Sequence, residues 1–500
     1  MTVSLNSMSV PMSAALEIAQ HALRDGLSRA IDDYRPGYHL APPAGWMNDP
    51  NGVVYFRGEY HVFYQHYPFD AKWGPMYWGH AKSADLVHWQ HLPIALAPGD
   101  DFDRDGCFSG SAVVCGDTLA LIYTGHTWLG DVGDERSIRQ VQCLATSVDG
   151  IRFVKHGAVI ERAPQDTIMH FRDPKVWQED DCWYLIAGAR LGDMPLLPLY
   201  RSTDLHVWEF LNYVSGGREG DGYMWECPDL FRLNGRDVLL YSPQGMPPQG
   251  YDRLNKYQTG YRVGRLDNEW HFTGGPFIEL DNGHDFYAAQ TLLAADGRRL
   301  VWAWLDMWES PMPSQAHHWC GMLGLPRELE LCADRLCVYP ARELTALRKA
   351  PMPSTPWWEA SGTRWVPEVN GDMLEIHVHL DMLDCTDGHL GIALRCSDDG
   401  HEQTLLYYDA ALQRLVLDRS RSGAQVTGQR SVSIDPTQER LALRVFLDRS
   451  SIEVFDENGR FSLSSRLYPR PDSLGVKLFN HGSGGRVSIP KAWHPDSGWL

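Results

Sequence analysis

The sequence lacks the features that mark several classes of protein. It has no basic cluster, and its 500 residues carry 45 Lys and Arg against 64 Asp and Glu, a net charge of −19. Nucleic acids and anionic membrane surfaces bind positive patches, so neither is expected as a partner. No apolar run approaches the roughly 18 residues that a membrane-spanning helix needs, and no signal-like segment opens the chain.

Paired cysteines are also missing. Ten cysteines are scattered along the chain without a C-x-x-C motif. This spacing favours reduced thiols over a disulfide framework or a structural zinc site. Together with the missing targeting segment, it predicts a cytoplasmic protein. Nothing in the sequence indicates an oligomeric state.

Aromatic residues, in contrast, are abundant. The chain has 19 Trp and 21 Tyr, most of them before residue 310. Flat aromatic faces pack against the C–H-rich faces of sugar rings, which points to a carbohydrate ligand. Aromatic residues also fill the interfaces between β-sheets, and composition alone leaves both interpretations open.

Hydrophobic periodicity divides the chain into an N-terminal helix and a long series of strands. In residues 13–33 the apolar side chains recur at helical spacing. They are Leu16, Ala19, Leu23, Leu27, Ala30 and Ile31. After Pro36 short apolar strands alternate with turn-forming residues as far as the C-terminus. The sequence therefore predicts an all-β protein with a short N-terminal helical segment, residues 1–37.

An apolar strand recurs five times between residues 38 and 345. The copies are YHVFYQ (60–65), LALIYT (119–124), WYLIAG (183–188), DVLLYS (237–242) and RLVWAW (299–304), and their starts differ by 59, 64, 54 and 62 residues. A second element, of the type SADLVHW (83–89), follows one strand later in four of them. A repeat of about sixty residues with about four strands is typical of a β-propeller. Residues 38–345 are therefore predicted to form a five-bladed β-propeller.

The rest of the chain has a different pattern. Residues 346–360 are rich in proline and are expected to be a linker. In residues 361–500 at least seven short strands follow one another without the sixty-residue period, which predicts a C-terminal β-sandwich. This part has no cluster of motif-like residues of its own, so we expect it to have a structural role.

Polar residues mark the start of the strand that precedes each recurring apolar strand. These positions hold Asp49, Ser109, Asp173, Glu226 and the segment 285–290. In a propeller the innermost strand of each blade runs along the central channel, so equivalent positions meet at one end of it. The repeat therefore predicts that Asp49, Asp173 and Glu226 point into one funnel.

Taken singly, each carboxylate has a simpler interpretation. Asp49 lies in the turn-forming segment NDPNG, Asp173 precedes a proline and follows Arg172, and Glu226 can be a strand-end surface residue. Taken together, three carboxylates in one aromatic-lined pocket cost electrostatic energy, which favours a functional role.

Clustered carboxylates beside Trp residues indicate glycoside hydrolysis, which needs one ionised carboxylate and one protonated carboxyl. The polar turn around Asp49 is expected to keep it ionised as the nucleophile. Glu226 lies between Trp225 and Cys227, so desolvation and neighbouring anions are expected to keep it protonated as the general acid. Asp173 is expected to stay ionised and to hold substrate hydroxyls.

Several motifs together resemble glycoside hydrolase family 32, the family of invertases, fructan hydrolases and sucrose-6-phosphate hydrolases. They are WMNDPNG, FSGSAV, FRDPK, ECPDL, DFYAAQT and LDRSSIEVFDENG, and the resemblance runs from about residue 38 to near the C-terminus. It implies a five-bladed propeller followed by a β-sandwich, retaining chemistry, and neither a metal nor another cofactor. It also implies that Asp49 is the nucleophile, Asp173 the transition-state stabiliser and Glu226 the general acid/base. Positions that line the fructose subsite in the family correspond to Asn48, Gln65, Trp73, Phe108, Ser109, Arg172, Tyr287 and Trp304.

Within the family, the chain resembles the intracellular sucrose and sucrose-6-phosphate hydrolases of bacteria, so a small sugar is the expected partner. A fructan exo-hydrolase and a fructosyltransferase on the same scaffold remain alternatives. A non-catalytic fructan-binding or sensing protein is another, although it would be expected to lack one of the three carboxylates. No residue identifies a phosphate site: Lys72, next to Trp73, has the simpler interpretation of a solvated loop lysine.

Overall fold

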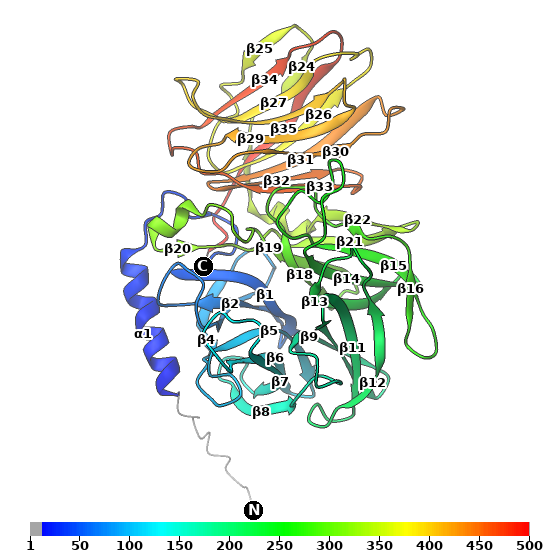
Figure 1. The fold of residues 1–500 in the computed structure, drawn as a ribbon. Helices are drawn as coiled ribbons and strands as arrows, with labels where there is room; N and C mark the ends of the chain where they lie inside the picture. The colour runs from blue at the N-terminus through cyan, green and yellow to red at the C-terminus, as the bar shows by residue number, and fades with distance from the viewer. Residues whose placement is uncertain (1–12, 500) are drawn as a thin grey trace, which may run out of the picture.

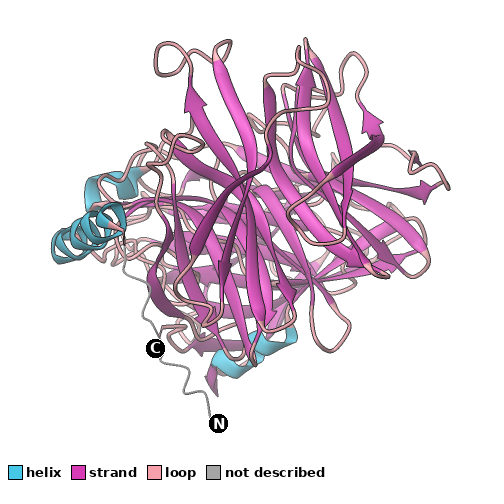
Figure 2. Ribbon diagram, turned by 90° about the horizontal axis from the view of Figure 1, so that it is seen from below, coloured by secondary structure: helices cyan, strands magenta, loops and turns pink. Residues whose placement is uncertain are grey.

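The computed structural model describes residues 13–499 and consists of a propeller with a sandwich of sheets packed beside it (Figure 1). Nearly all of the regular structure is strand, as Figure 2 shows. Strands from the first part of the chain form five separate sheets, and those from the second part form two. This confirms the predicted fold class of a five-bladed propeller followed by a β-sandwich with a short N-terminal helix.

Each blade is a sheet of four main strands. The first has β1 (Gly45–Phe56), β2 (Glu59–Tyr67), β3 (Tyr77–Ser83) and β4 (Gln90–Leu96), and the second β5 (Gly106–Cys115), β6 (Thr118–Trp128), β7 (Ile138–Ser147) and β8 (Val154–Ile160). The third has β9 (His170–Glu179), β10 (Cys182–Leu191), β11 (Met194–Ser202) and β12 (Glu209–Gly216). The fourth has β13 (Met224–Leu233), β14 (Arg236–Gln244), β15 (Gly260–Leu266) and β16 (Phe272–Gly274), with β17 (Ile278–Glu279) beside β15. The fifth has β18 (Tyr287–Leu293), β19 (Arg299–Trp304), β21 (Arg327–Cys332) and β22 (Arg335–Pro340).

The blades close into a ring. The innermost strands β1, β5, β9, β13 and β18 each contact the next, and β18 contacts β1. The short strand β20 (Trp319–Cys320) returns from the fifth blade to pair in parallel with β1. The recurring apolar segments of the sequence are the second strands of the blades, so the innermost strands carry the polar positions that precede them.

The second repeated element is a turn between the third and fourth strands of a blade. The carboxylates of Asp85, Asp149 and Asp204 each accept hydrogen bonds from the backbone N–H groups two and three residues further on. A short acidic side chain that bonds its own backbone favours such a turn. The second repeated element of the sequence therefore corresponds to a turn of the same type in three blades.

The predicted N-terminal helix is α1 (Ala14–Arg29), capped by the side chain of Ser13. Ala19, with Leu16 and Leu23, packs against the first blade. Leu27, in contrast, is 54% exposed. Of the apolar face predicted for residues 13–33, only the N-terminal half thus packs against the propeller.

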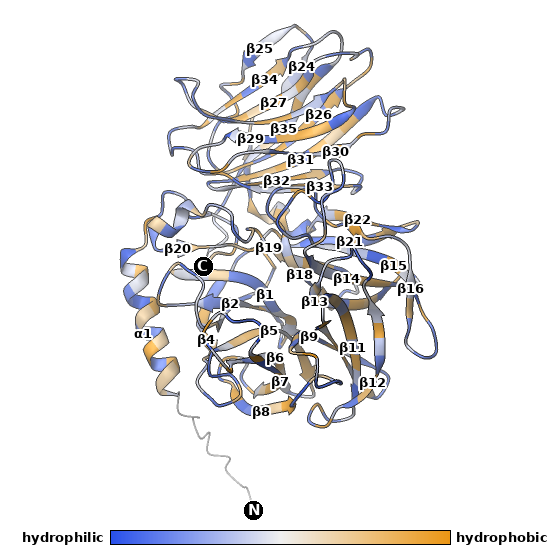
Figure 3. Cartoon of the chain, in the orientation of Figure 1, coloured by the Kyte–Doolittle hydropathy of each residue, from blue (hydrophilic) through white to orange (hydrophobic). Residues whose placement is uncertain are grey.

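The C-terminal sandwich has two sheets. One has the order β23 (Arg348–Pro351), β35 (Arg486–Pro495), β26 (Leu374–Asp381), β31 (Arg440–Asp448), β32 (Ser451–Asp456) and β33 (Ser462–Arg466), and β24 (Thr355–Trp358) also pairs with β35. The other has the order β25 (Gly362–Trp365), β34 (Gly475–Asn480), β27 (His389–Cys396), β28 (Gln403–Asp409), β29 (Arg414–Arg421) and β30 (Gln429–Ser433). Apolar residues on strands of both sheets, orange in Figure 3, form a shared core between them. Strands β23 and β24 lie within the predicted linker, residues 346–360.

Buried charges join the two parts of the chain. Arg327 of the fifth blade lies 2.9 Å from Asp281 and 2.5 Å from Glu453 of the sandwich. His39 bonds both Asp448 and Glu453, at 2.9 and 2.8 Å. Each buried charge has an opposite partner, which the low polarity of an interior requires.

The cysteines differ in one respect from the sequence prediction. Cys332 and Cys337 form a disulfide across the β21–β22 hairpin, whereas reduced thiols were expected throughout. The hairpin brings two residues five positions apart into reach, which a search for C-x-x-C cannot detect. The remaining eight cysteines are free. Within residues 13–499, no helix combines the length and the apolar character needed to cross a bilayer.

Candidate active site

A cavity of about 300 Å³ opens where the innermost strands begin. Side chains from the starts of β1, β5, β9 and β13 form its floor, and loops from several blades form its walls. The three predicted carboxylates, Asp49, Asp173 and Glu226, all line it. Two connecting segments, one between β6 and β7 and one after β19, contribute Glu135 and the pair Trp308 and Glu309.

Every innermost strand is interrupted by a β-bulge at the same level. The pairing with the second strand breaks immediately after Met47, Phe108, Arg172, Glu226 and Tyr287. A bulge bends the strand and redirects its side chains, and bulges are frequent beside active sites. Here they turn polar side chains of four strands, β1, β5, β9 and β13, into one cavity, and Tyr287 of β18 reaches Glu226 from behind.

The strand pairing also shows how the carboxylates are offset. Glu226 pairs opposite Ser242 as Arg172 pairs opposite Gly188, so Glu226 is equivalent to Arg172 and lies one residue before the level of Asp173. The sequence spacing agrees with this offset, because Glu226 precedes its recurring apolar strand by eleven residues and Asp173 precedes its own by ten.

Asp49 lies in the bulge of β1. Its Oδ2 accepts a hydrogen bond from the Ser109 hydroxyl at 2.6 Å, and its Oδ1 accepts one from the Asn48 amide at 3.0 Å. Both bonds favour the ionised form, but burial and the charge of Glu226 outweigh them and raise the pKa of Asp49 to about 6. Asp49 is therefore mainly ionised at neutral pH and takes up a proton at mildly acidic pH.

Asp173 is the most deeply buried of the three and has a left-handed backbone, with φ of 61°. Its N–H donates to Thr124 Oγ1 at 3.0 Å, and its Oδ2 accepts from the Cys227 N–H at 3.1 Å. Burial, followed by the charge of Glu226, raises the pKa of Asp173 well above its usual range. The prediction that Arg172 would keep Asp173 ionised is therefore wrong, since the nearest guanidinium nitrogen is 4.0 Å away.

Arg172 donates hydrogen bonds to Glu226 and not to Asp173. Its Oε1 is 2.9 Å from Arg172 Nε and 2.8 Å from Arg172 Nη2. Its Oε2 accepts from the Gln244 amide at 2.9 Å and from the Tyr287 hydroxyl at 2.5 Å. Side chains from the third, fourth and fifth blades thus fix the orientation of this carboxyl group.

The sequence neighbours of Glu226 do not form its surroundings. Trp225 stacks on Tyr241, with ring centroids 4.3 Å apart, and Cys227 Sγ is 3.7 Å from Asp49 Oδ2. Successive side chains of a strand point to opposite faces. The prediction that Trp225 and Cys227 would desolvate Glu226 is therefore wrong, because polar groups contact its carboxyl group instead.

The floor of the cavity holds three carboxyl groups and one guanidinium group, that of Arg172. Carboxylates this close and this buried resist ionising together, and burial with the charge of Glu226 raises the pKa of Asp173 in particular. An ionised carboxylate beside a protonated carboxyl is the arrangement that cleaves a glycosidic bond.

The structure places the other predicted residues in three ways. Six of them line the cavity: Asn48, Gln65, Trp73, Phe108, Ser109 and Arg172. Tyr287 reaches Glu226 through its hydroxyl group. Trp304 is fully buried and lies behind the wall, with its ring 5.0 Å from that of Trp308. Trp304 therefore supports Trp308 and does not itself line the cavity.

Several lining residues were not predicted from the sequence. They are His126, Trp128, Glu135, Ile138, Gln140, His170, Gln244, Tyr257, Trp308 and Glu309. Most of them lie at the ends of second and third strands or in loops, where the sixty-residue repeat is not maintained. Within the described range 13–499, no three His, Cys, Asp or Glu side chains are grouped as a metal site would require.

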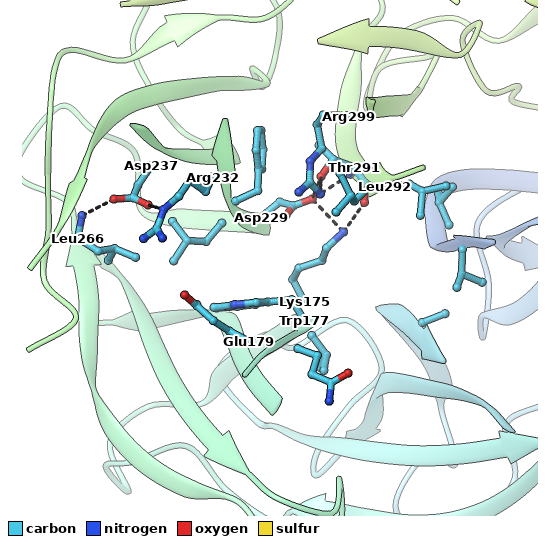
Figure 4. A pocket seen from close by; sticks show the side chains of 18 of the residues that line it. Lys175, Trp177, Glu179, Asp229, Arg232, Asp237, Leu266, Thr291, Leu292 and Arg299 are labelled. Carbon is cyan, nitrogen blue, oxygen red and sulfur yellow. Dashed lines mark hydrogen bonds and ion pairs between the residues drawn. The ribbon is translucent and has the colours of Figure 1, made fainter. Parts of the chain in front are cut away.

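A second cavity, of about 420 Å³, is lined by residues that follow the bulges along the innermost strands, among them Lys175, Asp229 and Thr291 (Figure 4). Four of its charged side chains form two pairs: Lys175 Nζ is 2.9 Å from Asp229 Oδ2, and Arg232 is 3.2 Å from Asp237. Thr291 donates two further hydrogen bonds to Asp229 Oδ2. These interactions are those of a structural ion-pair network, and the first cavity remains the candidate active site.

Comparison with known proteins agrees with this geometry. Residues 39–340 match the model of the glycosyl hydrolases family 32 N-terminal domain, and residues 343–494 match that of the C-terminal domain. The chain is 46% identical over 487 residues to a sucrose-6-phosphate hydrolase of Zymomonas mobilis, covering 94% of each. It is 48% identical over 470 residues to a raffinose invertase of Escherichia coli, covering 94% of this chain and 96% of the relative. The solved β-fructofuranosidase of Bombyx mori superposes with a TM-score of 0.86 at 36% identity, covering 97% of this chain and 99% of that one.

Proposed function

The chain belongs to glycosyl hydrolase family 32 and is a β-fructofuranosidase acting on sucrose or sucrose 6-phosphate, and we propose that it works through a covalent fructosyl intermediate. One observation carries the proposal. Asp49 and Glu226 line the same cavity from different blades, and hydrogen bonds fix the orientation of each. Their environments differ, which allows one to attack while the other transfers a proton.

In the first step Asp49 attacks the anomeric carbon of the fructosyl unit. An Asp49–carbon bond forms, the glycosidic bond breaks, and Glu226 gives its proton to the departing glucosyl oxygen. Asp49 is ready for this step at neutral pH because its carboxylate is mainly ionised there. The Ser109 hydroxyl and the Asn48 amide hold the attacking group in place.

In the second step water replaces the enzyme on the fructosyl carbon. Glu226, now ionised, takes a proton from the water, whose oxygen bonds the anomeric carbon as the bond to Asp49 breaks. Free fructose leaves, and Asp49 and Glu226 return to their starting states. The role we propose for Asp173 is to hold substrate hydroxyls on the deep side, where its carboxyl group is fixed by the Cys227 N–H.

Two substitutions test these roles. Asp49→Asn and Glu226→Gln are each expected to lower kcat for sucrose by roughly a thousandfold or more, since each removes one half of the mechanism. Glu226→Gln should regain part of its rate on an activated aryl fructoside, whose leaving group needs no proton, whereas Asp49→Asn should not. Asp181→Asn, an exposed hairpin residue, is the control for a neutralised charge.

The products separate this function from its alternatives. Free fructose in equal amount to free glucose at high sucrose supports hydrolysis. Accumulated fructo-oligosaccharides would show that a sugar replaces water as the acceptor. Substantial turnover by either carboxylate variant would overturn the assignment of the residues, and binding of sucrose without turnover by the unaltered chain would indicate a sensing protein.

A cytoplasmic location is the remaining part of the proposal. Eight free cysteines support it, although Cys332 and Cys337 are paired. Activity that is released only when producing cells are lysed would agree with this location. Activity in the medium of intact cells would contradict it.

A further inference from the structure

The mouth of the active-site cavity carries negative charge. Glu135, between β6 and β7, and Glu309, after β19, both line the cavity and both are exposed. Behind them lie Asp49, Asp173 and Glu226. We use the term cavity mouth for Glu135, Trp308 and Glu309.

Positive charge is scarce in the same place. Among the described residues that line the cavity, Arg172 is the one Lys or Arg side chain. Its Nε and Nη2 bond Glu226, and its Nη1 bonds His170 Nδ1 at 2.9 Å. The guanidinium group of Arg172 is therefore already bonded to other residues of the site.

The other basic side chains near the cavity do not change this balance. Burial lowers the pKa of His126 to about 4 and that of His170 to about 3, so both rings are neutral at physiological pH. Lys256 lies beside the mouth and pairs with Glu309 at 2.8 Å, an exposed pair that offsets part of the charge of Glu309 and leaves that of Glu135. Lys72 is exposed and is not part of the cavity lining.

A phosphate monoester carries close to two negative charges at neutral pH, since its second pKa is about 6. We infer that the chain takes the neutral disaccharide sucrose and discriminates against sucrose 6-phosphate, because Glu135 and Glu309 flank the part of the cavity that receives the departing glucosyl unit. The inference rests on the proposed function, in which Asp49 holds the fructosyl unit at the bottom and the glucosyl unit faces the mouth. Specificity here comes from repulsion of the charged competitor.

The direct test compares the two sugars. We expect kcat/KM at pH 7.5 and low ionic strength to be roughly tenfold or more higher for sucrose than for sucrose 6-phosphate, as repulsion between a dianion and the two exposed carboxylates of the mouth predicts. Raising the salt concentration should shrink the ratio, because the mouth is solvent-exposed and its charges are screened. A ratio of one, or a preference for the phosphorylated sugar, would overturn the inference.

Charge-neutral variants identify the residues responsible. The double substitution Glu135→Gln with Glu309→Gln removes two carboxylates and frees Lys256, so it should lower the sucrose preference by roughly fivefold or more, mainly through sucrose 6-phosphate. Asp181→Asn, at the other end of the third blade, removes a charge of the same kind and should leave the ratio unchanged. If the double variant keeps the ratio of the unaltered chain, the mouth does not discriminate.

A binding measurement separates this inference from the proposed function. Calorimetry with glucose and glucose 6-phosphate on the unaltered chain reports the charge preference of the mouth without turnover. Weaker binding of glucose 6-phosphate supports the inference even when neither disaccharide is cleaved, an outcome that would overturn only the proposed function. Tighter binding of glucose 6-phosphate would overturn the inference.

Discussion

Asp49 receives two hydrogen bonds and still has a raised pKa, because burial and a neighbouring carboxyl group act in the opposite direction. The balance keeps the nucleophile ionised at neutral pH and close to the point where it takes up a proton. A carboxylate with a raised pKa is a stronger nucleophile than one whose negative charge is fully paired with hydrogen-bond donors or cations.

The pH dependence of the reaction should show this balance. Asp49 must be ionised to attack, and its pKa lies above its ordinary value, so kcat/KM for sucrose should fall as pH drops through about 6. Ser109→Ala removes a donor that favours the ionised form and should move this acid limb upward by about 0.5 to 1 pH unit. Rates measured from pH 4 to 8 test the shift. Ser111→Ala is the control, because its hydroxyl accepts from the Val176 N–H instead, and a limb that moves equally in both variants would contradict the assignment.

The sequence identified the acidic residues but not all of their neighbours. The repeat predicted that Asp49, Asp173 and Glu226 share a cavity, and the structure brings them together. It did not predict that Arg172 pairs with Glu226 in preference to Asp173. Which of two close carboxylates an arginine contacts depends on side-chain geometry across blades, and no local pattern encodes it.

At the scale of single elements, the bulges of the innermost strands decide where the chemistry lies. Three of the five bulges contain a residue with a left-handed backbone: Asp173, Cys227 and Ala288. A residue with a Cβ atom adopts this conformation at a cost. These strained residues lie in the bulges beside the cavity, where each bulge redirects a side chain.

The fifth blade offers a test of this strain. Ala288 has φ of 56°, whereas its neighbour Ala289 is equally buried without a left-handed backbone. Ala289→Gly should lower the free energy of unfolding by about 1 kcal/mol, because it adds chain entropy to the unfolded state and removes a packed methyl group. Ala288→Gly carries the same two costs, but it also relieves the steric cost of the left-handed backbone, so it should be more stable than Ala289→Gly by about 1 kcal/mol. Chemical denaturation measures both, and an equal loss in the two variants would contradict the interpretation.

At the scale of the whole molecule, the sandwich reaches the active site through one buried arginine. Arg466, in β33, lies 2.6 Å from Asp306 and donates to Ser310 Oγ at 2.6 Å. Ser310 in turn donates to the Met307 carbonyl at 2.6 Å. These bonds fix the loop that carries Trp308 into the cavity mouth. The sandwich was predicted to be structural, and this contact gives it a positioning role as well.

Removing one bond of this connection should affect substrate binding more than stability. Ser310→Ala is expected to raise KM for sucrose roughly two- to fivefold, since a bond to a charged group that orders the loop is lost. The change in kcat should be smaller, because neither Asp49 nor Glu226 contacts this loop residue. Steady-state kinetics and a thermal melt measure both effects.

Ser450→Ala is the matched control for that variant. Ser450 Oγ donates to the Tyr34 carbonyl at 2.6 Å, also between the sandwich and the N-terminal part of the chain, but it is not part of the cavity lining. It should lower the melting temperature to a similar extent and leave KM unchanged. An unchanged KM in Ser310→Ala, or an equal rise in Ser450→Ala, would contradict a positioning role.

The sequence by itself determined the number of blades, the β-sandwich and the strands that carry the carboxylates. These follow from apolar periodicity and turn chemistry, which are local and repeat along the chain. Only the tertiary structure decided the bulged geometry at Glu226, the pairing of Arg172 and the acidic cavity mouth formed by Glu135 and Glu309. Bulges and loops from different blades create these features, and their relative positions depend on how the whole ring packs.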